Sequence, residues 1–221
     1  VPSELLEGKT RISTGMRQEA ERCAAAVDAA LAGEPTALVC SGDPGIYALA
    51  GLALETLEAR GLVGVVPFAV VPGVPAVCAA AALLGAPLMH DFACISLSDL
   101  LTPWETIVRR LEAALAADFV CVLYNPRSRG RQGQLAAALD LARNYREPHC
   151  PVGVVRQAFR PGQSAAVLRL DTVDPEQVDM LSLCIIGNAT SRALGPYMLT
   201  PRGYERKRRP LPDARPPMRG A

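Results

Sequence analysis

Hydrophobic positions along the chain follow a helical period in some stretches and form short continuous runs in others. Residues 14–32 place apolar side chains at helical spacing and stop at Gly33 and Pro35, so we expect an amphipathic helix there. Residues 36–40 (TALVC) are a short apolar run that leads through a Gly-Asp-Pro-Gly loop into an Ala- and Leu-rich segment. This order predicts a strand, a tight turn and a second helix.

The order of strand, polar loop and helix recurs along the chain. Further strands are expected at residues 63–71, 92–97, 119–124, 152–157, 165–170 and 181–186, and further helices at residues 48–60, 77–84, 103–115 and 132–145. Alternating strands and helices are typical of an α/β fold with parallel strands. We therefore expect an α/β protein with two domains, residues 1–103 and 104–204, followed by an Arg- and Pro-rich tail at residues 205–221.

The chain opens with a helix, although doubly wound sheets normally begin with a strand whose following loop binds the ligand. Residues 1–10 (VPSELLEGKT) carry no strand pattern. Two explanations stay open: the chain is a piece of something longer, or its N-terminal parallel sheet lacks its first strand.

Composition excludes several classes of protein. The 221 residues are 50% hydrophobic and carry a formal net charge of +1, which gives no reason to expect nucleic acid or a membrane surface as a partner. No apolar run approaches the roughly 20 residues that span a bilayer. The seven cysteines form no CxxC pair, which favours a reducing cytoplasm, and two histidines are too few for a histidine metal site.

The loop after the first expected strand, SGDPG at residues 41–45, is the first candidate site. Glycine lets the backbone approach a ligand closely, and the Asp43 carboxylate accepts hydrogen bonds. A phosphate cradle is disfavoured, because the loop has no lysine and its carboxylate would repel a phosphate. A simple chain turn and a pocket for a neutral or cationic small molecule both remain open.

Polar loops also follow two later strands, with SLSD at residues 96–99 and GNATS at residues 187–191. Small residues, hydroxyls and amides at strand ends suit the binding of a polar small molecule, although SLSD fits a helix cap equally well. Arginines crowd the C-terminal half near expected strand ends: Arg127, Arg129, Arg131, Arg156, Arg160, Arg192 and Arg202. Their planar guanidinium groups suit carboxylate recognition, against the alternative of an ordinary solvated surface.

Acid–base chemistry has few candidates in this sequence. His90 and Asp91 are neighbours, and histidine titrates near neutral pH, but a structural role for His90 is the stronger alternative. No motif suggests a Ser-His-Asp or Cys-His arrangement.

Several segments, taken in order and spacing, resemble the tetrapyrrole (corrin/porphyrin) methyltransferase family over about residues 8–206. They are SGDPGIYALAG, VVPGVPA, PLMHDFACISLSDLLTPWE, LYNPRSRGR, VVRQAFRPGQ, CIIGNATSR and MLTPRGY. The likeness is strongest to the branch that methylates carbon 17 of precorrin-3B and contracts the ring to precorrin-4 in cobalamin biosynthesis. The anaerobic counterpart of that branch acts on cobalt-factor III.

The resemblance implies two α/β domains with S-adenosylmethionine between them, a homodimer, and a tetrapyrrole substrate whose carboxylates the arginines bind. It assigns the cofactor site to Gly42, Asp43, Pro44, Ile46, Ala76, Ser96, Ser98, Tyr124, Asn125, Gly187, Asn188 and Thr190. For the substrate it suggests Arg127, Arg129, Arg131, Arg156 and Arg202, and for proton transfer Asp91, His90 and Asp99.

The family begins with a strand and a GxGPGD-type loop, which this sequence does not contain. We therefore expect the N-terminal sheet to lack its first strand and the chain alone to be a poor methyltransferase. A non-catalytic tetrapyrrole-binding fragment is the alternative from another class of protein, and a methyltransferase of the same fold with another acceptor is a further one.

Overall fold

A computed structural model describes residues 3–15, 18–128 and 130–204 of the chain. It divides into two compact units, Val1–Ala76 and Val77–Ala221. The sequence predicted this boundary at residue 103. The division comes earlier because the strand at Phe92–Ser96 pairs with Val120–Tyr124 and so belongs to the C-terminal sheet.

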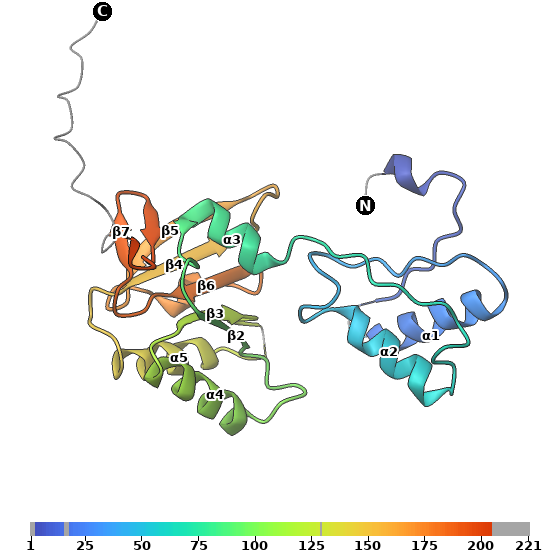
Figure 1. Ribbon diagram of the computed structural model, residues 1–221, viewed down its shortest axis with the longest axis horizontal. Helices are drawn as coiled ribbons and strands as arrows, with labels where there is room; N and C mark the ends of the chain where they lie inside the picture. The colour runs from blue at the N-terminus through green and yellow to red at the C-terminus, as the bar shows by residue number, and fades with distance from the viewer. Residues whose placement is uncertain (1–2, 16–17, 129, 205–221) are drawn as a thin grey trace, which may run out of the picture. The chain divides into compact units, whose positions relative to one another are not determined.

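The N-terminal unit is built on two helices (Figure 1). A short 3-10 helix, η1 (Ser3–Leu6), precedes α1 (Glu19–Leu31) and α2 (Leu49–Ala59), which pack against each other. Cys23 and Val27 of α1 and Leu49, Ala53 and Leu57 of α2 are buried. Helical spacing of apolar residues predicted the first of these helices, and the Ala- and Leu-rich composition predicted the second.

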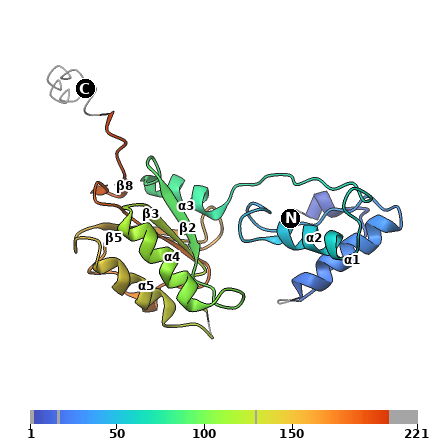
Figure 2. The same ribbon diagram turned by 60° about the horizontal axis from the view of Figure 1, so that its bottom comes forward.

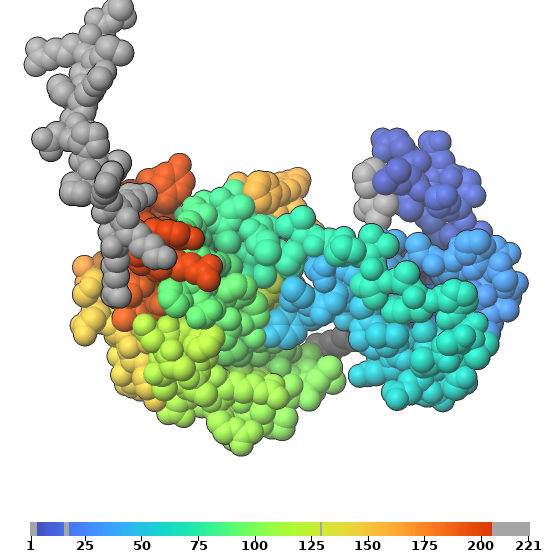
Figure 3. Space-filling model, viewed as in Figure 1, coloured from blue at the N-terminus to red at the C-terminus, as the bar shows by residue number. Residues whose placement is uncertain are grey.

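Neither strand predicted in this unit forms. Residues 37–40 and 67–72 are extended but unpaired, and residues 62–66 form a turn with an isolated bridge between Val63 and Val66. In the described residues, the backbone groups of residues 37–40 and 67–72 make no hydrogen bonds, so neither stretch belongs to a sheet. Apolar side chains along them remain exposed, including Val39 at 55% and Val71 at 79%. The segment around residues 62–75, cyan to teal in Figure 3, lies on the visible surface of the unit. A strand needs a neighbouring backbone to form its ladder, and apolar β-branched sequence alone does not supply one.

Between these extended segments and the two helices lies a cavity of about 490 Å³. Its lining is mostly apolar and comes from α1, α2 and residues 36–40 and 66–73. The extended segments therefore lie over the two helices without filling the space between, and part of their apolar side chains stays exposed.

The C-terminal unit contains the main sheet. Its elements are α3 (Ala76–Leu84), β1 (Gly85–Ala86), β2 (Phe92–Ser96), α4 (Trp104–Ala116), β3 (Val120–Tyr124), α5 (Gln134–Arg143), β4 (Pro151–Arg156), β5 (Ser164–Arg169), η2 (Pro175–Gln177), β6 (Ser182–Ile186), β7 (Arg192–Leu194) and β8 (Tyr197–Leu199). The five-stranded sheet has the order β2-β3-β6-β4-β5, and β1, β8 and β7 form a smaller sheet. The apolar runs predicted the large sheet's strands to within a residue or so at each end, whereas the small sheet was not predicted.

Helices cover both faces of the large sheet (Figures 1 and 2). Cys121 and Leu123 of β3 pack with the buried faces of α4 and α5, while Val120 and Val122 point to the other face and pack with α3. Gly153 of β4 makes room for α3, because a Cβ at this position would lie 2.3 Å from a methyl carbon of Leu84. The continuous apolar sequence of β3 is thus explained by burial on both faces.

Strand direction in this sheet is mixed. β2 and β3 are parallel, but β6 runs antiparallel to both β3 and β4, and β5 runs antiparallel to β4. The ends of β2, β3 and β4 therefore lie at one edge of the sheet together with the start of β6. The end of β6 lies at the opposite edge.

We expect amide hydrogen exchange to distinguish the unpaired extended segments of the N-terminal unit from the paired strands of the large sheet. Amides of residues 37–40 and 68–71 should exchange at rates near those of an unstructured chain, because they donate no hydrogen bonds to the residues that the structure describes, while those of β3 should be strongly protected. Mass spectrometry of peptic fragments measures this, with α2 as the control in the same unit. Protection of residues 37–40 equal to that of β3 would contradict the unpaired conformation.

Candidate functional site

Asp43 joins two loops of the N-terminal unit. Its Oδ1 accepts a hydrogen bond from the Gly45 amide at 2.8 Å, and its Oδ2 accepts one from the Gly73 amide at 3.0 Å. Gly42 has a φ of +76°, a conformation that favours glycine. The loops touch so closely that a Cβ on Gly73 would lie 2.2 Å from the Gly42 carbonyl oxygen. The SGDP loop and the PGVP segment are therefore locked together by backbone contact and one carboxylate.

The other expected cofactor residues of this region lie along the same segments. Pro44 accepts a hydrogen bond on its carbonyl from Ala50 in the first turn of α2, and Ile46 is 38% exposed. Ala76 is exposed and is the first residue of α3. The Asp43 loop thus presents the apolar side chain of Ile46 at its surface.

A second cluster forms in the C-terminal unit where β2 and β3 end. Ser96 and Tyr124 are paired across the ladder. The Asn125 Nδ2 donates to Ser96 Oγ at 2.9 Å, and the Ser98 amide donates to the same oxygen at 3.2 Å. The phenol oxygen of Tyr124 accepts from the Val77 amide at 2.9 Å, at the first turn of α3. The structure therefore brings together four of the residues assigned to the cofactor site.

Strained backbone gathers at this same edge. Asn125, Gln157 and Phe159 have positive φ values of 51°, 47° and 57°, which non-glycine residues rarely adopt. Asn125 follows β3, and the other two follow β4. Such outliers persist only where surrounding contacts hold them, and they are common at functional sites. Backbone conformation of this kind leaves no signal in the amino-acid pattern, so the sequence did not single out Gln157 or Phe159.

Arg156 and Asp179 form an ion pair beside these residues. Arg156 Nε lies 2.7 Å from Asp179 Oδ2, and its Nη1 donates to Gln157 Oε1 at 3.0 Å. Partial burial raises the pKa of Asp179, but hydrogen bonds from Arg156, Ser182 and the Leu181 amide outweigh burial and leave that pKa below its usual value. Asp179 therefore serves as a fixed anion that joins the end of β4 to the start of β6.

The remaining arginines that were expected to bind the substrate differ in how many hydrogen bonds they make within the protein and in how exposed they are. Arg127 donates to Glu176 Oε2 and to two backbone carbonyls near η2, and its side chain is only 17% exposed. Arg131 is 5% exposed and donates to Ser98 Oγ and to the Asn125 carbonyl. Arg160, Arg192 and Arg202 are exposed, and Arg129 lies outside the described residues.

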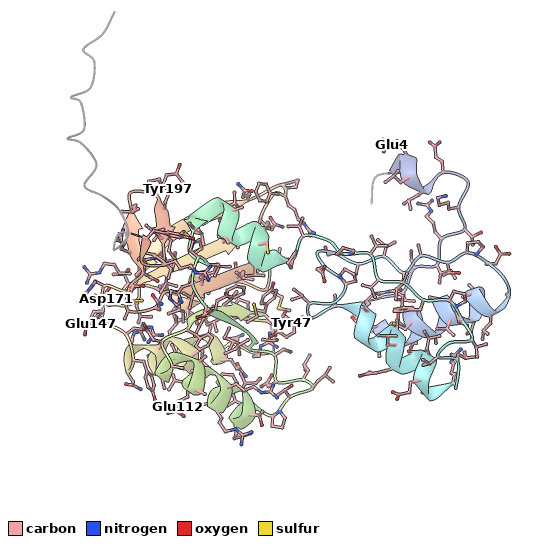
Figure 4. The ribbon with its side chains drawn as sticks, in the orientation of Figure 1. Glu4, Tyr47, Glu112, Glu147, Asp171 and Tyr197 are labelled. Atoms are coloured by element: carbon pink, nitrogen blue, oxygen red, sulfur yellow. The ribbon has the colours of Figure 1, made fainter. Side chains whose placement is uncertain are left out.

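The GNATS loop lies at the other end of the sheet, because β6 is antiparallel to β3. Ile186 is opposite Cys121, so Gly187 and the residues after it lie beyond the start of β3 rather than beside Asn125. Asn188 is 5% exposed, and its Oδ1 accepts hydrogen bonds from Thr190 and Ser191. The structure therefore does not bring Gly187, Asn188 and Thr190 together with the strand-end cluster. Glu147 and Asp171, labelled in Figure 4, flank β4 and β5 at this other end.

The expected acid–base residues are also divided between the two ends. His90 and Asp91 precede β2, where the Asp91 carbonyl accepts from the Val120 amide, so both lie at the GNATS end. The His90 Nδ1 accepts a hydrogen bond from the Asp91 amide at 2.8 Å. Asp99 follows Ser98 and accepts from Gln134 Nε2 at 2.8 Å, at the start of α5. Of the three candidates, Asp99 is the one beside the strand-end cluster.

Other kinds of chemistry find little support in the described residues. Burial raises the pKa of Cys184 and of Cys121 to about 12 and that of Cys150 to about 11, so these thiols stay protonated at neutral pH. Within residues 3–15, 18–128 and 130–204, no three His, Cys, Asp or Glu side chains are grouped as metal ligands. The helices of the same ranges include none long and apolar enough to cross a bilayer.

Comparison with known proteins identifies the family. The family model for tetrapyrrole (corrin/porphyrin) methylases matches residues 3–174. The chain belongs to this family. It is 52% identical over 196 residues to a probable cobalt-factor III C(17)-methyltransferase of Salmonella typhimurium, covering 89% of this chain and 80% of that protein. It is 41% identical over 184 residues to a precorrin-3B C(17)-methyltransferase of Sinorhizobium sp, covering 82% and 72% of the two chains.

Solved structures agree with the family. The crystal structure of the methyltransferase CobJ matches with a TM-score of 0.84 and 39% identity, over 88% of this chain and 82% of that one. A uroporphyrin-III C-methyltransferase from Thermus thermophilus, complexed with S-adenosylhomocysteine, matches with a TM-score of 0.59 and 25% identity, over 83% and 78%. The predicted fold class, a two-domain α/β methylase fold, is thereby confirmed.

The close contact of Gly73 with Gly42 generates a stability prediction. Replacing Gly73 with alanine should destabilise the N-terminal unit by about 1–3 kcal/mol, because the new Cβ meets backbone that cannot move aside cheaply. Gly51→Ala is the matched control, since a Cβ there meets nothing within 4 Å and alanine favours the helix α2. Urea unfolding of both variants measures the difference. Equal midpoints for the two would contradict the contact.

Proposed function

We propose that the chain transfers a methyl group from S-adenosylmethionine to ring carbon 17 of precorrin-3B, with ring contraction to precorrin-4, in cobalamin biosynthesis. The observation that carries this proposal is family membership together with the names of relatives at 52% and 41% identity, both of which are C(17)-methyltransferases. The strand-end cluster around Ser96 and Asn125 adds physical support, since it gathers hydroxyl and amide groups where a polar ligand can be gripped.

The residues present fit a sulfonium cofactor. The Asp43 carboxylate offers negative charge, and each of its oxygens keeps a lone pair beyond the bond to Gly45 or Gly73. The carbonyls of the extended backbone at residues 37–40 accept no hydrogen bond from the described part of the chain. Ser96, Ser98, Tyr124 and Asn125 are the residues of the C-terminal unit that we propose for the same ligand. When bound, S-adenosylmethionine supplies an electrophilic methyl group.

The protein's own contribution to such a reaction is mainly positioning. Methyl transfer to carbon needs the acceptor in line with the methyl donor, and misplacement by about 1 Å can cost on the order of a hundredfold in rate. Ring contraction also requires protons to move, and we assign this role to Asp99, which borders the strand-end cluster, in preference to His90 and Asp91. Arg156 and Arg202 remain our proposed contacts for the substrate carboxylates.

Cobalt-factor III is the second candidate substrate, favoured by the name of the relative at 52% identity. By family resemblance we also propose a homodimer.

All seven cysteines are free, in keeping with the reducing cytoplasm that we propose as its location.

Binding of the demethylated cofactor tests the cofactor assignment. Asp43→Ala should weaken S-adenosylhomocysteine binding by about 1.5–3 kcal/mol, roughly ten- to a hundredfold, because a charged acceptor is lost. Isothermal titration calorimetry measures it, with Asp28→Ala as control, since Asp28 pairs with Arg60 on the surfaces of α1 and α2. Wild-type affinity in Asp43→Ala would refute the role of this loop in cofactor binding.

Single-turnover methylation tests the reaction and its substrate. With S-adenosylmethionine in excess, we expect precorrin-3B to gain one methyl group, which mass spectrometry measures as an increase in mass. We expect cobalt-factor III to react more slowly. A faster reaction with cobalt-factor III would favour the second candidate. Binding of both ligands without methyl transfer would instead support a non-catalytic tetrapyrrole-binding fragment and refute the proposed activity.

A further inference from the structure

Arg131 is a buried arginine in the loop between β3 and α5. Its exposure is 5%, although the surrounding sequence (NPRSRGRQG) is polar and rich in arginine. Its Nη1 donates to Ser98 Oγ at 3.2 Å, and its Nη2 donates to the Asn125 carbonyl at 2.7 Å. The two ends of the guanidinium group therefore reach the loops that follow β2 and β3, respectively.

These bonds hold a backbone that would otherwise relax. Asn125 has a φ of +51°, a left-handed conformation that asparagine tolerates better than most residues but that still needs neighbouring groups to hold it. Arg131 fixes its carbonyl, while Ser96 fixes its side-chain amide. Ser96 Oγ also accepts from the Ser98 amide, so a closed set of hydrogen bonds joins Ser96, Ser98, Asn125 and Arg131.

The charge of Arg131 is an unusual feature of this set. The described residues give it no carboxylate partner within ion-pair distance, and its Nε is buried without a hydrogen-bond partner among them. An unsatisfied buried donor is destabilising, so stability alone does not account for an arginine at this position. Arg127, in contrast, is paired with Glu176.

We propose that Arg131 is a positioning residue that aligns the Ser98 and Asn125 loops for the cofactor, and that it does not bind the carboxylates of the tetrapyrrole. The inference rests on the proposed function and corrects the role that the sequence suggested for this arginine. A guanidinium group that is nearly buried and already holds two loops cannot also serve a large polycarboxylate at the surface. Arginine is suited to this role because its rigid fork fixes two acceptors at once, which lysine cannot do.

Two sets of variants separate positioning from substrate binding. Arg131→Gln should weaken S-adenosylhomocysteine binding about tenfold, with Arg131→Lys intermediate, while the salt dependence of tetrapyrrole binding stays as in wild type. Ser98→Ala should reproduce part of the loss, and adding it to Arg131→Lys should cost less than the sum of the two effects, because the residues act together. Arg169→Gln is the control, since Arg169 makes an exposed ion pair with Asp171.

The outcomes are distinct. Unchanged cofactor affinity in Arg131→Gln, with weaker tetrapyrrole binding and a flatter salt dependence, would overturn the inference and restore Arg131 as a substrate residue. If the Arg131 variants do not fold, Ser98→Ala still decides, and wild-type cofactor affinity in that variant would overturn the inference. Failure of the wild-type chain to bind S-adenosylhomocysteine would overturn the proposed function itself, and the inference with it.

Discussion

The antiparallel placement of β6 between β3 and β4 determines which loops of the C-terminal unit can act together. Because β6 runs against both neighbours, its start lies beside the ends of β3 and β4, and its end lies beside their beginnings. Asp179 thereby accepts hydrogen bonds from both Arg156 and Ser182 at the strand-end edge, while the GNATS loop lies at the other edge. A parallel β6 would exchange these two loops and leave the Asn125 edge without the Arg156–Asp179 pair.

Arg146 stabilises the opposite edge of the sheet and is an example of an arginine whose contacts are all within the protein. Arg146 has a side chain that is 3% exposed, and it donates to four backbone carbonyls, those of Leu115, Phe119, Tyr145 and Gly187. It also lies 3.3 Å from the Asp118 carboxylate, which accepts a hydrogen bond from the Ala189 amide. Arg146 thus has both a carboxylate partner and four carbonyl acceptors for its N–H groups, and it holds the end of β6 against the end of α4. Arg131 differs in both respects.

The extent to which the sequence predicts this molecule follows from which interactions are local. Apolar runs predict the strands β3 and β6 because burial on both faces leaves a continuous hydrophobic signal. Strand direction leaves no such signal, since parallel and antiparallel strands share one side-chain period, and so the position of the GNATS loop could not be foreseen. The runs at residues 36–40 and 63–71 have strand-like composition, but pairing also needs a neighbouring backbone. Ser96 and Ser98 could be proposed because polar groups after an apolar strand are visible in the sequence, whereas Asn125 was proposed from the family resemblance.

Arginines were harder to interpret, because their role depends on the three-dimensional course of the loops around them. In the sequence, Arg127 and Arg131 occupy the same polar loop and have the same chemistry. The fold pairs the first with the exposed Glu176 beside η2, and it inserts the second between two strand ends, where its neighbours are a hydroxyl and a strained carbonyl. A polar loop that follows a buried strand can therefore carry both surface charge and an internal brace. The partners of each guanidinium group, a carboxylate for Arg127 and a hydroxyl with a strained carbonyl for Arg131, therefore separate the two arginines, whereas their place in the motif does not.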